Sequence, residues 1–170
     1  MKPILYLLVI VCCPLGAFCQ DITGLWQGTM YNDSTHQSLE YELVISKVKG
    51  RLTGFSQTSY VVNDKKYFGI KKIDVRVAKD GKIVMQDAKM IANNYPGTPN
   101  KNVIQLNVLS LASSGEETFL DGIFVTNRSK DFQAFTGRLS IKKLNPSLSK
   151  SDLLDYLQKN DTDNSFTAVK

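Results

Sequence analysis

The chain contains few of the residues from which reactive sites and covalent cross-links are built. It has three cysteines, one histidine and one tryptophan, and Cys12, Cys13 and Cys19 all lie within the first 19 residues. After residue 19, a disulfide framework, a cysteine nucleophile and a zinc site made of cysteine and histidine are therefore excluded. We expect no metal ion and no cofactor, and a domain held together by its own hydrophobic core.

Side chains suited to acid–base catalysis are also sparse. The one histidine, His36, lies in a polar, turn-like stretch, and no serine occurs in a Gly-x-Ser-x-Gly elbow, which argues against a serine hydrolase. Glu40 and Glu42 share one face of an expected strand, whereas glycoside hydrolysis needs carboxylates on opposite sides of a cleft. The sequence therefore favours a protein that is not an enzyme.

Long apolar runs are absent too. Near the N-terminus, residues 4–11 are apolar but too few for a lasting membrane anchor, and small residues precede Gln20. We predict that residues 1–19 form a secretory signal peptide, that the mature protein is secreted or periplasmic, and that it has no transmembrane segment. Because the bulky Phe18 precedes Cys19, lipid anchoring at Cys19 is not expected.

The basic residues do not form a binding surface for nucleic acid. The formal net charge is +5, but the lysines are scattered in pairs such as Lys65-Lys66 and Lys71-Lys72. Such pairs indicate solvated strand faces and turns. Nucleic-acid binding needs a continuous basic stripe with interleaved aromatic side chains, so nucleic acid is not an expected partner.

Beyond Gln20 the chain consists of short alternating segments separated by turn signals such as Lys49-Gly50 and Asp80-Gly81. An offset in the apolar pattern after Ile70 predicts a bulge or a change of face near Lys71 and Lys72. The expected strands cover residues 23–31, 39–46, 51–60, 67–77, 82–88, 103–111, 118–125 and 134–143.

This pattern predicts an all-β protein, an eight-stranded antiparallel up-and-down barrel, because a meander of this length has exposed edges unless it closes. A two-sheet β-sandwich is the alternative. The barrel domain is expected over residues 20–145, and a short helix with a polar tail over residues 146–170. Ser149 or Ser151 can cap this helix, whose apolar face should pack outside the barrel.

The phrase Gly24-Leu25-Trp26 on the first expected strand and Arg138 on the last resemble the pattern of the calycin superfamily, the lipocalin-like barrels. The resemblance implies that Trp26 packs across the closed end of the barrel and that the Arg138 side chain lies over its ring. Gly24, Trp26 and Arg138 would then be structural residues.

The resemblance and the apolar strands together favour a non-catalytic binding protein that holds a small apolar or amphipathic molecule. The alternative is a surface interaction module with a filled barrel that contacts a protein or a glycan. A long loop over residues 93–100 is the expected gate of the pocket. The candidate ligand-binding residues are Tyr41, Phe55, Phe68, Tyr95, Leu106 and Phe119, and the further side chains expected to face inward are Leu43, Ile70, Val108 and Phe124.

Overall fold

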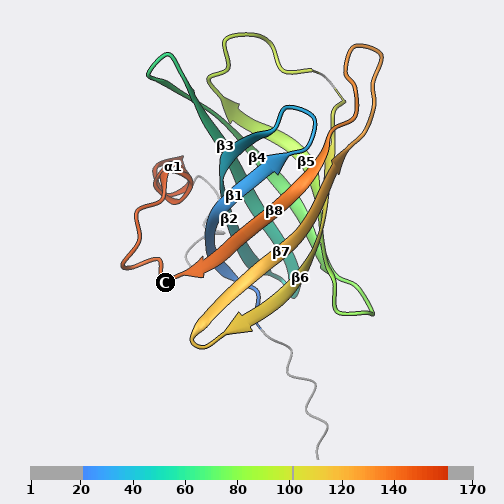
Figure 1. The fold of residues 1–170 in the computed structure, drawn as a ribbon. Helices are drawn as coiled ribbons and strands as arrows, with labels where there is room; N and C mark the ends of the chain where they lie inside the picture. The colour runs from blue at the N-terminus through green and yellow to red at the C-terminus, as the bar shows by residue number, and fades with distance from the viewer. Residues whose placement is uncertain (1–20, 101, 161–170) are drawn as a thin grey trace, which may run out of the picture.

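The computed structural model describes residues 21–100 and 102–160, so the expected signal peptide and polar tail lie outside the described residues. Within these residues, eight strands close into a barrel in chain order, and one helix follows them (Figure 1). The strands are β1 (Gly24–Asn32), β2 (Gln37–Val48), β3 (Arg51–Val62), β4 (Lys65–Val77), β5 (Ile83–Asn93), β6 (Gln105–Ser114), β7 (Glu117–Thr126) and β8 (Thr136–Leu144).

Every neighbouring pair of strands is antiparallel, including the pair β1 and β8 that closes the barrel. The predicted all-β, eight-stranded up-and-down barrel is therefore confirmed, and the two-sheet sandwich was wrong. Closure removes the exposed edges that an open meander would present. The turn signals are confirmed as well, since Lys49, Gly50 and Gly81 have positive φ angles of 49°, 80° and 81°.

Inward-facing side chains fill the end of the barrel at which β1 begins. Trp26 is fully buried there, and its indole N–H donates a hydrogen bond to the carbonyl oxygen of Ile22 at 3.1 Å. The core of this end also contains Leu43, Ile45, Ile73, Val75, Ile83, Met85, Leu109, Leu120, Leu139 and Ile141. We call this the closed end, and it lies at the bottom of Figure 1.

Arg138 does not lie over Trp26, which corrects the contact that the resemblance implied. In the register of β1 and β8, Trp26 pairs with Lys143 and Arg138 pairs with Tyr31. Arg138 is exposed. Its side chain points outward because Arg138 lies five positions before Lys143 on β8, and residues an odd number of positions apart on a strand face opposite sides. The ammonium of Lys143 takes its place, 5.7 Å from the centroid of the Trp26 ring.

The predicted irregularity near Lys71 and Lys72 is present, but the extra residues belong to the partner strand. The register between β4 and β5 shifts on both sides of these lysines, which leaves Ile91 and Ala88 of β5 without a partner on β4. Residues 83–86 of β5 pair with β6, and the rest of β5 continues along β4. The two bulges thus separate the second half of β5 from β6 and open the wall of the barrel.

The helix α1 (Asp152–Asn160) packs on the outside of β2 and β3, as expected. Its buried residues Leu153 and Leu157 contact Leu25 and Val44 of the outer wall. Ser151 caps the helix, since its hydroxyl accepts a hydrogen bond from the backbone N–H of Leu154 at 3.0 Å.

The apolar side chains of β3 and β4 beneath this helix were expected in the interior, and that expectation was wrong. Phe55, Phe68 and Ile70 belong to the outer cluster that the helix covers. Their inward neighbours are small or polar, because Ser56, Gly69 and Lys71 alternate with them along the strands.

Candidate functional site

Among the described residues, two hollows that have the size of a small-molecule site concern the predicted binding residues or the predicted gating loop. The first, which we call the mouth cavity, has a volume of about 480 Å³ and lies at the gap between β5 and the loop that leads to β6. The second, the helix groove, has a volume of about 420 Å³ and lies between α1 and the outer wall of β3 and β4. Small-molecule sites span roughly 300–1,000 Å³.

An ion pair forms the inner wall of the mouth cavity. The ammonium of Lys71 on β4 contacts the carboxylate of Asp87 on β5, and both residues line the cavity. The Asp87 side chain is only 9% exposed, and its carboxylate also accepts a hydrogen bond from the backbone N–H of Gln105 at 3.0 Å. Removing such charges from water costs several kcal/mol per ion before their attraction offsets it.

A second polar layer lies below this ion pair inside the barrel. Gln105 donates a hydrogen bond from Nε2 to Oδ1 of Asn107 at 2.8 Å, and Asn107 is fully buried. Among residues 21–100 and 102–160, the Nδ2 group of Asn107 has no hydrogen-bond partner. An unsatisfied buried donor costs about 1–3 kcal/mol.

Three tyrosines stand at the rim of the barrel beside the cavity. The Tyr60 ring stacks on Tyr67 with centroids 5.5 Å apart and on Tyr95 with centroids 6.1 Å apart. Tyr95 comes from the β5–β6 loop and lies over Gly69, where a Cβ atom would approach its hydroxyl oxygen to 2.1 Å. Glycine at position 69 therefore makes room for Tyr95 at the inner face of β4.

The tyrosines near the ion pair are held neutral. Burial raises the pKa of Tyr95 above its ordinary value, and the nearby Tyr60 and Asp87 raise it further. Burial also raises the pKa of Tyr41, and the charge of Asp87 adds to this effect, whereas a hydrogen bond with Ser56 opposes it. Ionised phenolates are thus disfavoured in the interior because their charge would be desolvated beside a carboxylate.

The loop between β7 and β8 covers another part of the rim. Phe135 packs against the interior core, and its ring contacts Phe132 edge-on with centroids 4.9 Å apart. The barrel is therefore narrowed on the β7–β8 side, and the gap beside β5 forms its lateral opening.

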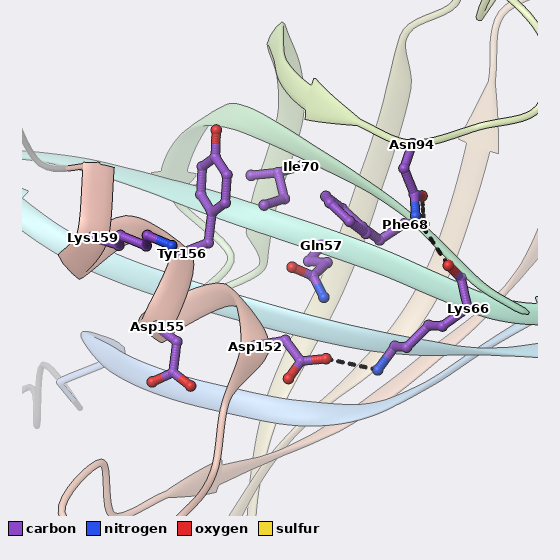
Figure 2. A pocket seen from close by; sticks show the side chains of 9 residues that line it. All are labelled: Gln57, Lys66, Phe68, Ile70, Asn94, Asp152, Asp155, Tyr156 and Lys159. Carbon is purple, nitrogen blue, oxygen red and sulfur yellow. Dashed lines mark hydrogen bonds and ion pairs between the residues drawn. The ribbon is translucent and has the colours of Figure 1, made fainter.

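The helix groove has aromatic and aliphatic walls (Figure 2). Phe68 and Ile70 project from β4, and Tyr156 projects from α1 above them. The groove is closed at one side by Lys66, whose ammonium lies 2.8 Å from Asp152 and 3.0 Å from Glu40. The hydrogen bond to Asp152 raises the pKa of Lys66, although partial burial opposes this shift.

The structure distributes the predicted ligand-binding residues over several places. Tyr41 is buried inside the barrel, Tyr95 stands at the rim, and Phe68 lines the helix groove. Phe55 packs in the outer cluster, and strand alternation turns Leu106 and Phe119 outward on β6 and β7. Of the further expected residues, Leu43 and Phe124 face inward, whereas Val108 faces outward beside Ile123.

The apolar pattern of the strands did not predict the polar part of the interior. Lys71, Asp87, Gln105 and Asn107 were not among the candidates. Lys71 carried a usable signal, because alternation along β4 places it on the same face as Ile73 and Val75. A lysine on the inward face of a barrel strand predicts a buried charge partner.

Comparisons with protein-family models, with curated proteins and with solved structures found no match to this chain. The architecture, a closed antiparallel barrel of eight strands, is compatible with a lipocalin-like fold. Within the described part of the chain, no helix has the length and apolar character needed to cross a membrane.

Proposed function

We propose that this protein is an exported, non-catalytic binding protein, secreted or periplasmic, and a member of the lipocalin-like barrels. Its ligand would be a small amphipathic molecule held in the mouth cavity. The barrel closure and the position of Trp26 at the closed end support the kinship with lipocalins. The predicted signal peptide supports the export.

One observation carries the proposal: the mouth cavity has a charged pair at depth and both apolar and amide side chains nearer its rim. Lys71 and Asp87 supply charged groups, and Met90, Val103 and Ile104 supply apolar contacts. A molecule with a polar head and a short apolar body matches this lining. Buried charges need polar partners, and apolar side chains bind the apolar part of a ligand because both are then removed from water. The loop before β6 would admit such a molecule through the lateral opening.

A second function is favoured by the outer face of β6, β7 and β8. Ile123 is 62% exposed there, and its neighbours across the strands are Val108 and Arg138. Exposed apolar residues beside an arginine are typical of protein interfaces. In this reading the protein is a surface interaction module for a protein or glycan partner.

Native mass spectrometry of the purified protein, followed by organic extraction, tests the ligand proposal. We expect a discrete bound molecule in the wild type and its loss in the double variant Lys71→Met/Asp87→Leu, which removes both charges from the cavity. The matched control is Lys72→Met, which removes an exposed lysine on the outer face of the same strand. An empty wild type that also fails to bind a panel of amphipathic acids and amines would overturn the proposal in favour of the interaction module.

A further inference from the structure

The helix groove contains a mostly buried carboxamide that makes a single hydrogen bond with the described residues. Gln57 of β3 is 2% exposed, and its side chain points into the groove between β4 and α1 (Figure 2). Nε2 donates one hydrogen bond to the hydroxyl oxygen of Ser59 at 3.1 Å, and this is the only hydrogen bond of the carboxamide with the described residues. A glutamine side chain offers two donor hydrogens and an acceptor oxygen, so most of its capacity is free.

The walls around this carboxamide suit a flat molecule. Phe68 and Tyr156 present aromatic rings from β4 and α1, and Ile70 lies between them at the back of the groove. Aromatic rings favour planar partners, which stack on their faces or meet their edges. The volume of about 420 Å³ leaves room for a bicyclic ring.

The charged side chains that line the groove balance one another. Lys66 and Lys159 line it together with Asp152 and Asp155, and Lys66 is already paired with Asp152 and with the neighbouring Glu40. The lining residues therefore carry no net charge, and the Glu40 carboxylate beside them is held by Lys66. A neutral ligand avoids the cost of bringing a new charge into a half-enclosed space.

We propose that the helix groove is a second binding site, distinct from the mouth cavity, that takes a neutral planar ring with a cis-amide edge. In such a lactam edge the N–H and the C=O stand side by side. They match the side-by-side acceptor and donor of the Gln57 carboxamide, while the ring occupies the space between Phe68 and Tyr156. The site depends on the docked position of α1, which supplies Tyr156.

A titration of the ¹⁵N-labelled protein with 2-quinolone, followed by NMR, tests this proposal. We expect shifts of the backbone signals of β3, β4 and α1 around Gln57, Phe68 and Tyr156. N-methyl-2-quinolone has the same ring system but lacks the amide N–H, and it should bind about tenfold more weakly because one buried hydrogen bond is lost.

Protein variants separate the carboxamide contact from general apolar binding. Gln57→Met keeps the length of the side chain and should abolish the preference for 2-quinolone over its N-methyl analogue. Gln86→Met, at an exposed position on β5, is the matched control and should keep it. If Gln57→Met does not fold, Tyr156→Leu provides the second test and should weaken both probes about equally, since the ring contact is lost but the carboxamide remains.

Equal affinity for the two probes, shifts confined to the mouth cavity, or no shifts at all would overturn the proposal. The double variant Lys71→Met/Asp87→Leu should bind 2-quinolone as the wild type does. The two sites can therefore fail or hold separately, because no residue lines both of them.

Discussion

The ammonium of Lys143 lies 5.7 Å from the centroid of the Trp26 ring, where the resemblance to lipocalins implied an arginine. Lys143 also donates a hydrogen bond to the carbonyl oxygen of Asp21 at 2.8 Å. It therefore ties the segment before β1 to β8 across the closed end. This contact replaces the arginine with a point charge that can reach both the ring and a carbonyl group.

Replacing Lys143 should destabilise the barrel, whereas replacing Arg138 should not. For Lys143→Ala we expect the free energy of unfolding to fall by about 1 kcal/mol, through loss of the ring contact and the hydrogen bond. Arg138→Ala should stay within about 0.5 kcal/mol of the wild type because its side chain is exposed. Urea unfolding followed by the fluorescence of Trp26, the only tryptophan, measures both. A larger effect for Arg138→Ala would contradict this assignment.

The docking of α1 depends on its capped N-terminus. The Glu42 carboxylate accepts hydrogen bonds from the Ser151 hydroxyl and from the backbone N–H of Leu153, the latter at 3.2 Å. Ser151→Ala should cost about 1 kcal/mol and speed amide hydrogen exchange in α1, since a cap and its anchor are lost together. Ser149→Ala is the control, because Ser149 makes no side-chain hydrogen bond with the described residues. Equal exchange in both variants would rule out the anchoring role.

Removing one partner of the interior ion pair should lower the free energy of unfolding more than removing both partners. Asp87→Ala leaves the Lys71 ammonium without its carboxylate, and we expect a loss of about 3 kcal/mol in unfolding free energy. The double variant Lys71→Met/Asp87→Leu should recover most of this loss, because no unpaired charge remains. Chemical denaturation of the two variants provides the comparison. A double variant no more stable than Asp87→Ala would show that the charges themselves hold the mouth together.

Alkaline pH should weaken the fold through Tyr41 and Tyr95. Their pKa values in the folded state are raised above the ordinary value of 10.0, so the unfolded chain loses these protons first. The stabilisation is therefore complete below about pH 10 and is lost as the pH rises toward the folded-state pKa values, by up to about 1.4 kcal/mol per pH unit for each group.

Unfolding free energies at pH 8 and pH 11 test this dependence. The difference between the two pH values should be smaller in Tyr95→Phe than in the wild type, because one linked proton is removed. Tyr31→Phe, which removes an exposed hydroxyl bonded to His36, serves as the control. The same pH dependence in all three proteins would exclude Tyr95 from the effect.

Filling the space at Gly69 should displace Tyr95 from the rim. A Cβ atom at position 69 would meet the Tyr95 hydroxyl oxygen at 2.1 Å, so we expect Gly69→Ala to cost about 1–3 kcal/mol. In a Tyr95→Ala background the same substitution should be nearly neutral, because the obstructing ring is absent. A double-mutant cycle measured by thermal unfolding gives the coupling energy. Additive effects would mean that Gly69 is needed for another reason.

Much of the barrel could be predicted because its signals are local. Positive φ angles at turns such as Gly50 and Gly81, and the alternation of Tyr41 with Glu40 and Glu42, are properties of adjacent residues. The number and order of the strands followed from them. The extension of β5 to Asn93 was not visible, because its bulges depend on how it pairs with β4.

The assignment of faces in β3 and β4 failed for a physical reason. An apolar side chain such as Phe68 or Ile70 can be buried either in the barrel or beneath a helix packed on the outside, and both positions give the same pattern. The helix that covers these residues begins more than 80 positions later in the chain. Its influence on β4 could not be read from the neighbouring residues.

The fold class, the turns and the sparseness of reactive groups could be read from the sequence, since these depend on composition and on contacts between near neighbours. Which distant residues meet depends on how the chain folds. The tertiary structure paired Lys71 with Asp87 across a bulge, placed Lys143 over Trp26 and turned Gln57 toward α1. Each of these contacts depends on strand register and barrel closure, which bring distant segments of the chain together. A shift of the register by one residue would turn every side chain of a strand to the opposite face.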